Sequence, residues 1–205
     1  SMGVKWVLVN ASGLREALGS RAVIVLGGPD AYQGVGEISS LLLPGMEQTY
    51  LRSVDGARVC YWAPPLSRGQ KLVVIAGRDR YETRRALEEF ISSGGLERLL
   101  EQEGPSYYYW YTTSCSVPPP TRLEVSSRSL YISIGTAIPN PCFRAVVSCS
   151  ISEGYIEVSI DYIQLPVICI QCLGSCHTEL TILGLEPGIY NVSVDGQLFT
   201  VSIPS

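Results

Sequence analysis

The sequence predicts a small, mostly parallel α/β domain followed by an antiparallel β-sandwich. Short apolar runs alternate with helix-like segments over the first hundred residues, a pattern typical of a parallel sheet covered by helices. After Pro120, apolar residues recur at every second position and turn residues follow at regular intervals, as in a sandwich. Six of the seven cysteines lie between Cys115 and Cys176, so redox chemistry is expected in the second half.

The first domain, residues 4–104, is expected to build its sheet from short apolar segments. Such runs are typical of strands that a parallel sheet buries on both faces. Asp55-Gly56 is a typical hairpin turn, so the two segments that flank it are expected to pair. The predicted strands are Trp6–Val9, Ala22–Leu26, Thr49–Ser53, Arg58–Trp62 and Leu72–Ala76.

Helices are predicted between these strands, and the clearest one begins at Asp79. Asp79 followed by Glu82 is a capping-box pattern, which satisfies free amides in the first turn of a helix. Gly94-Gly95 is expected to end this helix. Its predicted apolar face consists of Ala86, Phe90 and Ile91. Shorter helices are expected at 12–18, 31–43 and 96–102.

Residues 105–120 are expected to connect the two domains. The segment is rich in tyrosine and small polar residues, and it ends in Val117-Pro118-Pro119-Pro120, which favours an extended polyproline spacer. The aromatic run Tyr107–Tyr111 is typical of a strand or of an apolar pad between domains. We favour these interpretations over a stacking platform for a ligand.

The second domain, residues 121–205, shows the period of two that is typical of strands. One face is predicted to hold Phe143, Ala145, Val147, Cys149 and Ile151. The next is predicted to hold Ile156, Val158, Ile160 and Tyr162, across a turn at Glu153-Gly154. A second hairpin is expected at Asp195-Gly196. We expect residues 121–205 to fold alone under oxidising conditions.

Two segments resemble known families. Leu185-Glu186-Pro187-Gly188-Ile189-Tyr190 resembles the Leu-x-Pro-Gly segment and following tyrosine of fibronectin type III and related immunoglobulin-like domains. That resemblance implies an immunoglobulin-like sandwich and carries no function. Residues Val23–Pro29 and Val73–Arg84 resemble the small α/β domains of archaeal surface-layer-related proteins, which implies a surface or structural role.

Charge and hydropathy restrict the class of partner. The net charge is -4 and the 15 basic residues are scattered, so no nucleic-acid partner is expected. No run reaches the 18 or so apolar residues of a membrane span, and no span is expected within this sequence. Ser1-Met2-Gly3 is typical of what remains after removal of an expression tag, so removal of a signal peptide or anchor stays open.

Two glycine-containing loops are candidates for anion binding. Gly27–Asp30 follows a predicted strand, where free amides and a helix dipole favour an anion. Gly77–Arg80 follows another, and the carboxyl ends of parallel strands meet at one edge of a sheet. A plain tight turn is favoured for the first loop, since neither matches a nucleotide-binding motif. The candidate residues are Gly27, Gly28, Asp30, Gly77, Arg78 and Arg80.

The cysteine cluster allows metal binding or disulfides. Three thiols and an imidazole, enough for tetrahedral zinc, are supplied by Cys169, Cys172, Cys176 and His177. These candidates fall within nine residues, whereas structural zinc sites usually draw on two separated pairs. Three cysteines at this spacing also fit iron–sulfur ligation, which requires a fourth ligand. Disulfides in an oxidising compartment are therefore favoured, and no cofactor is expected.

Among the possible pairings, Cys142 with Cys169 is favoured. Both open predicted strands, and a bond between them closes a sizeable loop, worth about 3 kcal/mol on the loop-entropy model. Cys172 with Cys176 is expected as a local clip. Cys115 and Cys149 are then joined or free, and Cys60 is expected to be an inert buried thiol.

Catalysis and glycosylation have weak signals. His177 is the only histidine, so a nucleophile–histidine pair would have to use it, and no enzyme activity is expected. Asn10 and Asn191 each begin a glycosylation sequon.

The sequence thus predicts a non-enzymatic, extracellular or cell-surface protein of the envelope that acts by binding or assembly. Its expected partners are other envelope proteins or further copies of itself. One alternative is an intracellular protein, for example in hyperthermophile cytoplasm, that binds a phosphorylated ligand at the glycine loops. Another is a metal-dependent protein that uses the cysteine cluster.

Overall fold

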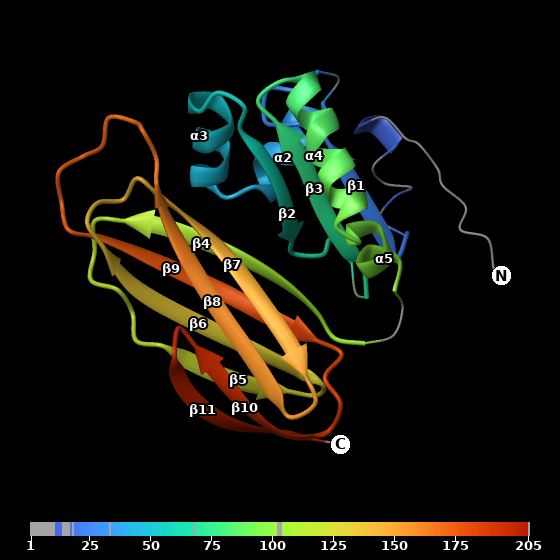
Figure 1. Ribbon diagram of the computed structural model, residues 1–205, viewed down its shortest axis with the longest axis vertical. Coiled ribbons are helices and arrows are strands. Elements are labelled where there is room, and N and C mark those ends of the chain that lie inside the picture. Colours follow the sequence, from blue (N-terminus) through green and yellow to red (C-terminus); the bar gives the residue numbers. More distant parts are fainter. Residues whose placement is uncertain are drawn as a thin grey trace.

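The computed structural model describes residues 11–13, 17, 19–32, 34–67, 69–101 and 104–204. The protein is mostly β, with 46% strand and 21% helix, and the described residues form three sheets (Figure 1). The predicted fold class is therefore wrong. The reasons lie in the first half, which contributes only a small mixed sheet, and in the topology of the second half.

The amino-terminal module, residues 11–101, contains a three-stranded sheet. Its strands are β1 (Ala22–Leu26), β2 (Arg58–Ala63) and β3 (Lys71–Gly77), in the order β1-β3-β2. β1 runs parallel to β3, as expected, but β2 runs antiparallel to it. A mostly parallel sheet was expected because short apolar runs do not encode strand direction.

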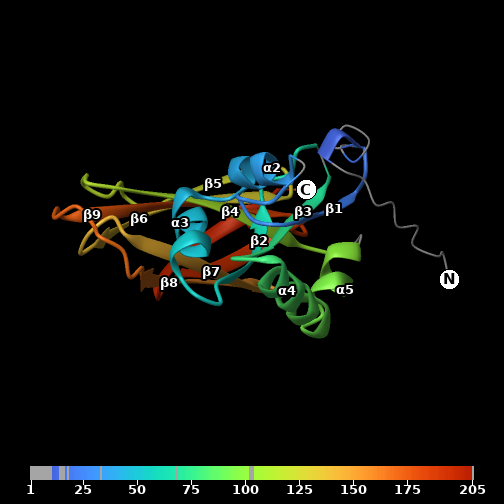
Figure 2. The same ribbon diagram turned by 90° about the horizontal axis from the view of Figure 1, so that it is seen from above.

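Helices cover both faces of this sheet (Figure 2). α4 and α5 pack on the face that carries Val73 and Ile75. α2 and α3 lie on the opposite side, where the core continues into the rest of the protein. The helical elements are η1 (Ala11–Gly13), α2 (Val35–Leu42), α3 (Gly45–Ser53), α4 (Arg80–Ser92) and α5 (Gly95–Leu100).

Two expectations for this module fail and one is confirmed. Thr49–Ser53 belongs to α3 and not to a hairpin strand, because Leu51 and Glu47 are buried on one helical face. The Asp79 carboxylate caps α4 by accepting hydrogen bonds from the Tyr81 and Glu82 amides, at 2.8 and 2.9 Å. Ile91, expected on the apolar face of α4, is exposed. The predicted strand at 6–9 and most of the helix at 12–18 lie outside the described residues.

The first sandwich sheet has the order β4-β9-β6-β5 and is antiparallel throughout. Its strands are β4 (Ser106–Ser114), β5 (Arg122–Ser126), β6 (Ser129–Ile138) and β9 (Gly174–Leu183). β4 lies in the segment expected to be a connector, and it pairs with β9 along its whole length. The sandwich therefore begins before residue 121, and a fragment 121–205 would lack one edge strand.

The second sandwich sheet has the order β11-β10-β8-β7. Its strands are β7 (Phe143–Ser152), β8 (Tyr155–Gln164), β10 (Gly188–Val194) and β11 (Gln197–Ile203). The hairpin at Asp195-Gly196 is confirmed, with both residues at positive φ. However, β10 pairs in parallel with β8, so the expected antiparallel immunoglobulin-like topology is wrong.

The module covers one side of the sandwich, and the junction between them is continuous core. β2 and α3 pack against β4 and β7, the neighbouring edge strands of the two sheets. The Tyr61 hydroxyl donates to the Tyr109 carbonyl, and the two rings meet edge to face at 4.8 Å. The aromatic run 107–111 is thus both a strand and a contact between the halves, as favoured from the sequence.

Candidate binding surface at the disulfide-linked end of the sandwich

Two disulfides join loops at one end of the sandwich. Cys142 is bonded to Cys169, the pair favoured from the sequence, and Cys115 is bonded to Cys172. The expected local clip between Cys172 and Cys176 is wrong, because Cys176 faces the core as a buried free thiol. The alternation of β9 points Cys176 inward, away from its neighbour in sequence.

We call the linked segments 115–120, 139–142 and 165–173 the clamped end. The first follows β4, the second joins β6 to β7, and the third joins β8 to β9. Hydrogen bonds add to the cross-links: the Leu165 amide donates to the Cys142 carbonyl at 2.9 Å, and the Cys142 amide donates to Asn140 Oδ1 at 3.0 Å. Three loops far apart in the sequence are therefore held as one surface.

The clamped end is uncharged and apolar. None of its residues is Asp, Glu, Lys, Arg or His, although 17% of the chain is charged. Ile168, Leu173 and Val117 are almost fully exposed, at 105%, 87% and 89%, and Ile170 is exposed as well. A surface with several large apolar side chains and no charge is typical of an interaction site.

The metal-binding alternative is not supported by the positions of its four residues. Cys169 and Cys172 belong to different disulfides, and Cys176 points into the core while His177 faces outward. His177 Nε2 lies 2.9 Å from the Ser133 hydroxyl. Within the residues that the structure describes, no three metal-binding side chains come together.

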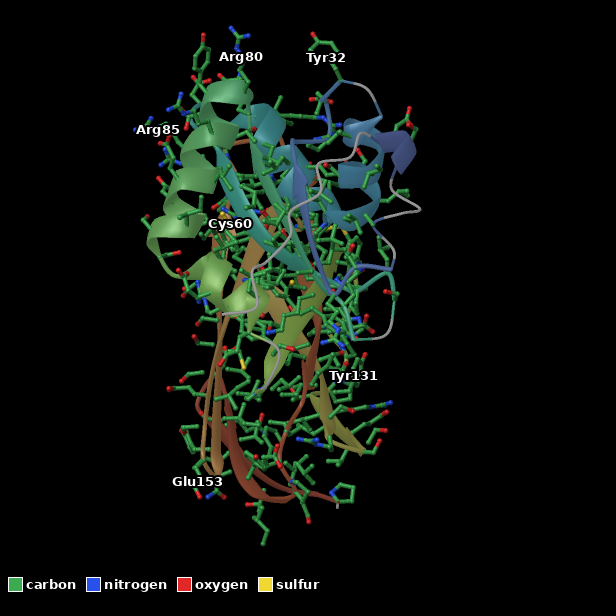
Figure 3. The ribbon with its side chains drawn as sticks, turned by 90° about the vertical axis from the view of Figure 1, so that its right-hand side faces the viewer. Tyr32, Cys60, Arg80, Arg85, Tyr131 and Glu153 are labelled. Atoms are coloured by element: carbon green, nitrogen blue, oxygen red, sulfur yellow. A yellow bond between two sulfur atoms is a disulfide. The ribbon has the colours of Figure 1, made fainter. Side chains whose placement is uncertain are left out.

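The remaining free thiols are not activated. Cys149 is half-buried, and burial raises its pKa to about 12, so the thiol stays protonated at neutral pH. Cys60, expected to be buried, is exposed beside α4 (Figure 3), and its Sγ lies 3.5 Å from the Ala86 carbonyl.

The two glycine loops meet as expected, because β1 and β3 are parallel neighbours. A Cβ on Gly28 would lie 3.2 Å from the Gly77 carbonyl oxygen, and the Gly27 amide donates to the Ile75 carbonyl. The Gly77 amide donates to Thr83 Oγ1 at 2.9 Å. These amides are therefore used within the protein.

The charged residues of the loops also have protein partners. Asp30 is paired with Arg52, and Arg78 is paired with Asp55 at 2.7 Å. The Arg80 guanidinium lies over the ring of Tyr81, at the exposed tip labelled in Figure 3. The loops come together, and the Gly27 and Gly77 amides and the side chains of Asp30, Arg78 and Arg80 all have partners within the protein.

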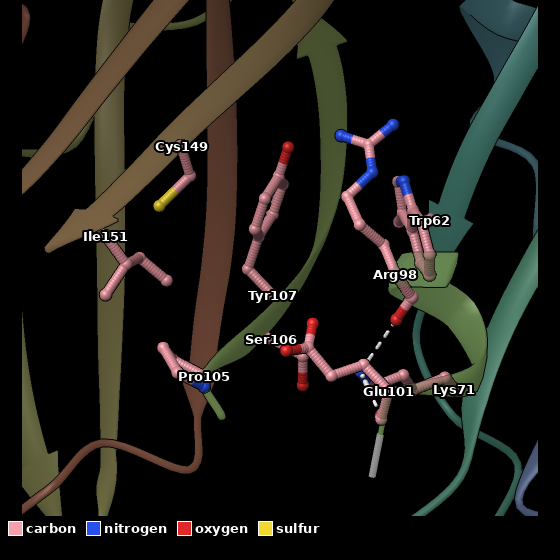
Figure 4. Close-up of a pocket in the computed structure, with 9 residues that line it drawn as sticks. All are labelled: Trp62, Lys71, Arg98, Glu101, Pro105, Ser106, Tyr107, Cys149 and Ile151. Carbon is pink, nitrogen blue, oxygen red and sulfur yellow. Dashed lines mark hydrogen bonds between the residues drawn. The ribbon is translucent and has the colours of Figure 1, made fainter. Parts of the chain in front are cut away.

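A cavity of about 330 Å³ lies between the module and the sandwich (Figure 4). Trp62 and Arg98 stand on one side of it, and Tyr107 and Cys149 on the other. Lys71 Nζ donates to the Arg98 and Glu101 carbonyls at 2.9 and 2.8 Å, which caps the end of α5. Burial lowers the pKa of Lys71. Lys71 therefore caps the end of α5. The residues that line the cavity include no activated nucleophile.

A buried ion pair fixes the other part of the junction. Glu47 of α3 is 0% exposed and accepts two hydrogen bonds from Arg144 of β7, at 3.2 and 2.8 Å. The Tyr111 hydroxyl donates to the same carboxylate at 2.9 Å, and the guanidinium lies over the Tyr50 ring at 4.2 Å. Burial raises the pKa of Glu47, and Arg144 opposes that shift.

Of the two sequons, Asn10 lies outside the described residues and Asn191 lies on β10. Asn191 is exposed, and its Oδ1 accepts a hydrogen bond from Thr200 at 3.2 Å. Glycosylation at both sites stays a prediction.

Comparisons of the chain with protein-family models, with curated proteins and with solved structures found no match. Among the described helices, none has the length and apolar character needed to cross a bilayer. The two disulfides fit an oxidising environment. The clamped end was not predicted as a surface, although 165–173 has no charge and contains two of the bonded cysteines.

Proposed function

We propose that the protein is a non-enzymatic, extracellular component of a cell envelope that assembles with further copies of itself through the clamped end. The observation that carries this proposal is the exposure of Ile168, Ile170 and Leu173 on loops that two disulfides hold in place. An exposed apolar surface of this kind is costly in water unless a partner covers it.

Charge favours a second copy as the partner. The chain has a net charge of -4, so copies repel one another wherever acidic residues meet. The clamped end carries no charge, and two copies can meet there without repulsion. Because the disulfides fix the loops beforehand, little conformational entropy is lost on association.

Sedimentation velocity over a concentration series tests the proposal. We expect association in about the micromolar to millimolar range, because a few apolar side chains per copy make a small interface. Replacing Ile168→Ser together with Leu173→Ser should weaken association at least about tenfold, since each buried apolar side chain contributes about 1.5 kcal/mol or more.

Ile189→Ser with Leu198→Ser is the matched control, because both residues are 69% exposed on the second sandwich sheet. This control should associate like the parent. A parent protein that stays monomeric at all concentrations would overturn self-assembly. Equal loss in both double variants would place the contact elsewhere. Binding to phosphatidylcholine vesicles without self-association would favour a lipid surface instead.

A further inference from the structure

The outward face of the first sandwich sheet carries a different kind of surface. Strand register places its outward residues in rows across the four strands. The first row is Tyr108, Thr181, Tyr131 and Glu124. The second row is Trp110, Glu179, Ser133 and Arg122. The third row is Thr112, His177 and Gly135. We call these rows the aromatic face.

Alternation along β4 separates the aromatic run into two sets. Tyr109 and Tyr111 are buried between the sheets, whereas Tyr108 and Trp110 point to the outside and are half-buried. Tyr108 and Tyr131 flank the small side chain of Thr181, so they stand on strands about 10 Å apart. Both aromatic side chains therefore lie on the outward face of the sheet, on either side of a smaller residue.

Hydrogen bonds orient the polar groups of the aromatic face. The Tyr131 hydroxyl donates to Glu179 Oε1 at 2.7 Å, and Ser133 Oγ lies 2.9 Å from His177 Nε2. Burial and Glu179 raise the pKa of Tyr131 to about 12, so its hydroxyl keeps its proton at neutral pH. Tyr131 thus holds Glu179 through Oε1, and the other carboxylate oxygen of Glu179 can accept further hydrogen bonds.

The aromatic residues on β4 also have free polar groups. Within the described part of the chain, the Trp110 indole N–H and the Tyr108 hydroxyl have no protein partner, and neither atom is buried. Aromatic side chains with an apolar ring and a free polar tip are common in binding sites. Here they lie beside oriented carboxylate and imidazole groups.

The segment between β4 and β5 crosses the sheet at one end of the aromatic face. Ser116 Oγ lies 2.9 Å from Ser175 Oγ, and Pro119 lies directly against Gly135. A Cβ on Gly135 would lie 1.9 Å from the Pro119 carbonyl oxygen, so only glycine permits this crossing. The polyproline segment therefore packs tightly on the sheet at this end of the aromatic face.

From this arrangement we infer that the aromatic face binds a neutral oligosaccharide. A pyranose ring has an apolar C–H face that fits an aromatic ring, and hydroxyls that both donate and accept hydrogen bonds. Trp110 and Tyr108 supply the rings, and Glu179 supplies a carboxylate acceptor. This inference is independent of assembly through the clamped end.

Charge argues against nucleic acid as the ligand. Single-stranded nucleic acid also stacks on aromatic rings, but it needs a positively charged groove. On the aromatic face, Arg122 is accompanied by the carboxylates of Glu124 and Glu179. A neutral ligand is thus favoured over a polyanion.

Isothermal titration calorimetry with cellohexaose, chitohexaose and mannohexaose tests the inference. We expect saturable binding of at least one of these sugars, and no tighter binding of a heparin hexasaccharide or an oligothymidylate. Trp110→Ala should weaken that binding at least about tenfold, because the stacking surface is lost. Glu179→Gln should weaken it by removing the charged acceptor while keeping the shape.

Tyr155→Ala is the matched control, because Tyr155 is an exposed tyrosine on the outer face of the second sandwich sheet. It should bind the sugar like the parent. Glu179→Gln keeps the inference falsifiable if Trp110→Ala fails to fold. Absence of binding to all three sugars, equal binding by the parent and Glu179→Gln, or preference for the polyanions would overturn it.

Discussion

The junction and the clamped end depart from the usual distribution of residues in opposite ways. At the junction, the charged pair Glu47–Arg144 is enclosed by tyrosines. At the clamped end, Ile168 and Leu173 are exposed to solvent. At the junction, the buried charges are stable only because hydrogen bonds satisfy them. At the clamped end, the exposed apolar residues add no burial that would hold the loops in place, so disulfides hold them instead. The protein therefore fixes its loops with disulfides and holds its two halves together with a buried ion pair.

The largest effect is expected from breaking the buried ion pair. Glu47→Ala leaves the Arg144 guanidinium buried without a counter-charge, so we expect the free energy of unfolding to fall by about 3–5 kcal/mol. Urea unfolding followed by circular dichroism measures the loss.

Glu47→Leu with Arg144→Met is the control for this prediction. The double variant removes both charges and keeps apolar volume, so it should be less destabilised than Glu47→Ala. If the single variant is as stable as the double variant, the ion pair does not hold the junction.

Alkaline pH should weaken the same junction. Burial raises the pKa of Tyr61, Tyr109 and Tyr111 well above the ordinary value near 10. Above pH 10 the unfolded chain releases these protons while the folded protein keeps them, so stability falls as pH rises. At pH 11 we expect a loss of about 1.4 kcal/mol for each tyrosine, or about 4 kcal/mol together.

Urea unfolding at pH 9 and pH 11 measures this loss. Tyr111→Phe should reduce the difference in unfolding free energy between the two pH values by about 1.4 kcal/mol. An unfolding midpoint that does not change between pH 9 and pH 11 would show that these tyrosines are not protected from ionisation.

Removing a disulfide from the clamped end should lower the thermal stability of the protein. Cys142→Ala with Cys169→Ala opens a loop with a sequence separation of 27, which costs about 3–4 kcal/mol on the loop-entropy model. The non-reduced double variant should melt at a lower temperature than the non-reduced parent. Adding reductant should also lower the melting temperature of the parent.

Cys60→Ala serves as the control, because Cys60 is an exposed thiol outside both disulfides. It should melt like the parent. Peptide mapping of protein never exposed to reductant should recover Cys142 linked to Cys169, and recovery of both as free thiols would contradict the cross-linked surface.

Local patterns predicted much of this structure. The capping residue Asp79 was found because its bonds lie within one turn. The strands β7 and β8 and the β10–β11 hairpin were found because burial on one face imposes a period of two. Thr49–Ser53 was assigned to a strand because a short segment does not reveal the distant side chain of Arg144 that α3 faces.

Long-range pairing could not be predicted from these patterns. The pair Cys115–Cys172 and the β4–β9 ladder join segments more than fifty residues apart, and nothing in either segment specifies its partner. The parallel pairing of β10 with β8 could not be predicted either, because parallel and antiparallel strands show the same alternation of apolar residues. Alternation separates Tyr108 and Trp110 from Tyr109 and Tyr111, but which pair is buried depends on distant strands, so the outward pair was not recognised.

The cover that the module places over β4 has a consequence for biosynthesis. β4 is translated about sixty residues before β9, its ladder partner, so an emerging chain presents an aromatic strand with an unpaired edge. Unpaired edges of this kind recruit other nascent chains. The amino-terminal module precedes β4 in the chain, so it is translated first. The contact of Tyr61 with Tyr109 allows β4 to pack against the module before β9 is available. We therefore expect the amino-terminal module to cover β4 before β9 is translated, which would limit contacts between nascent chains.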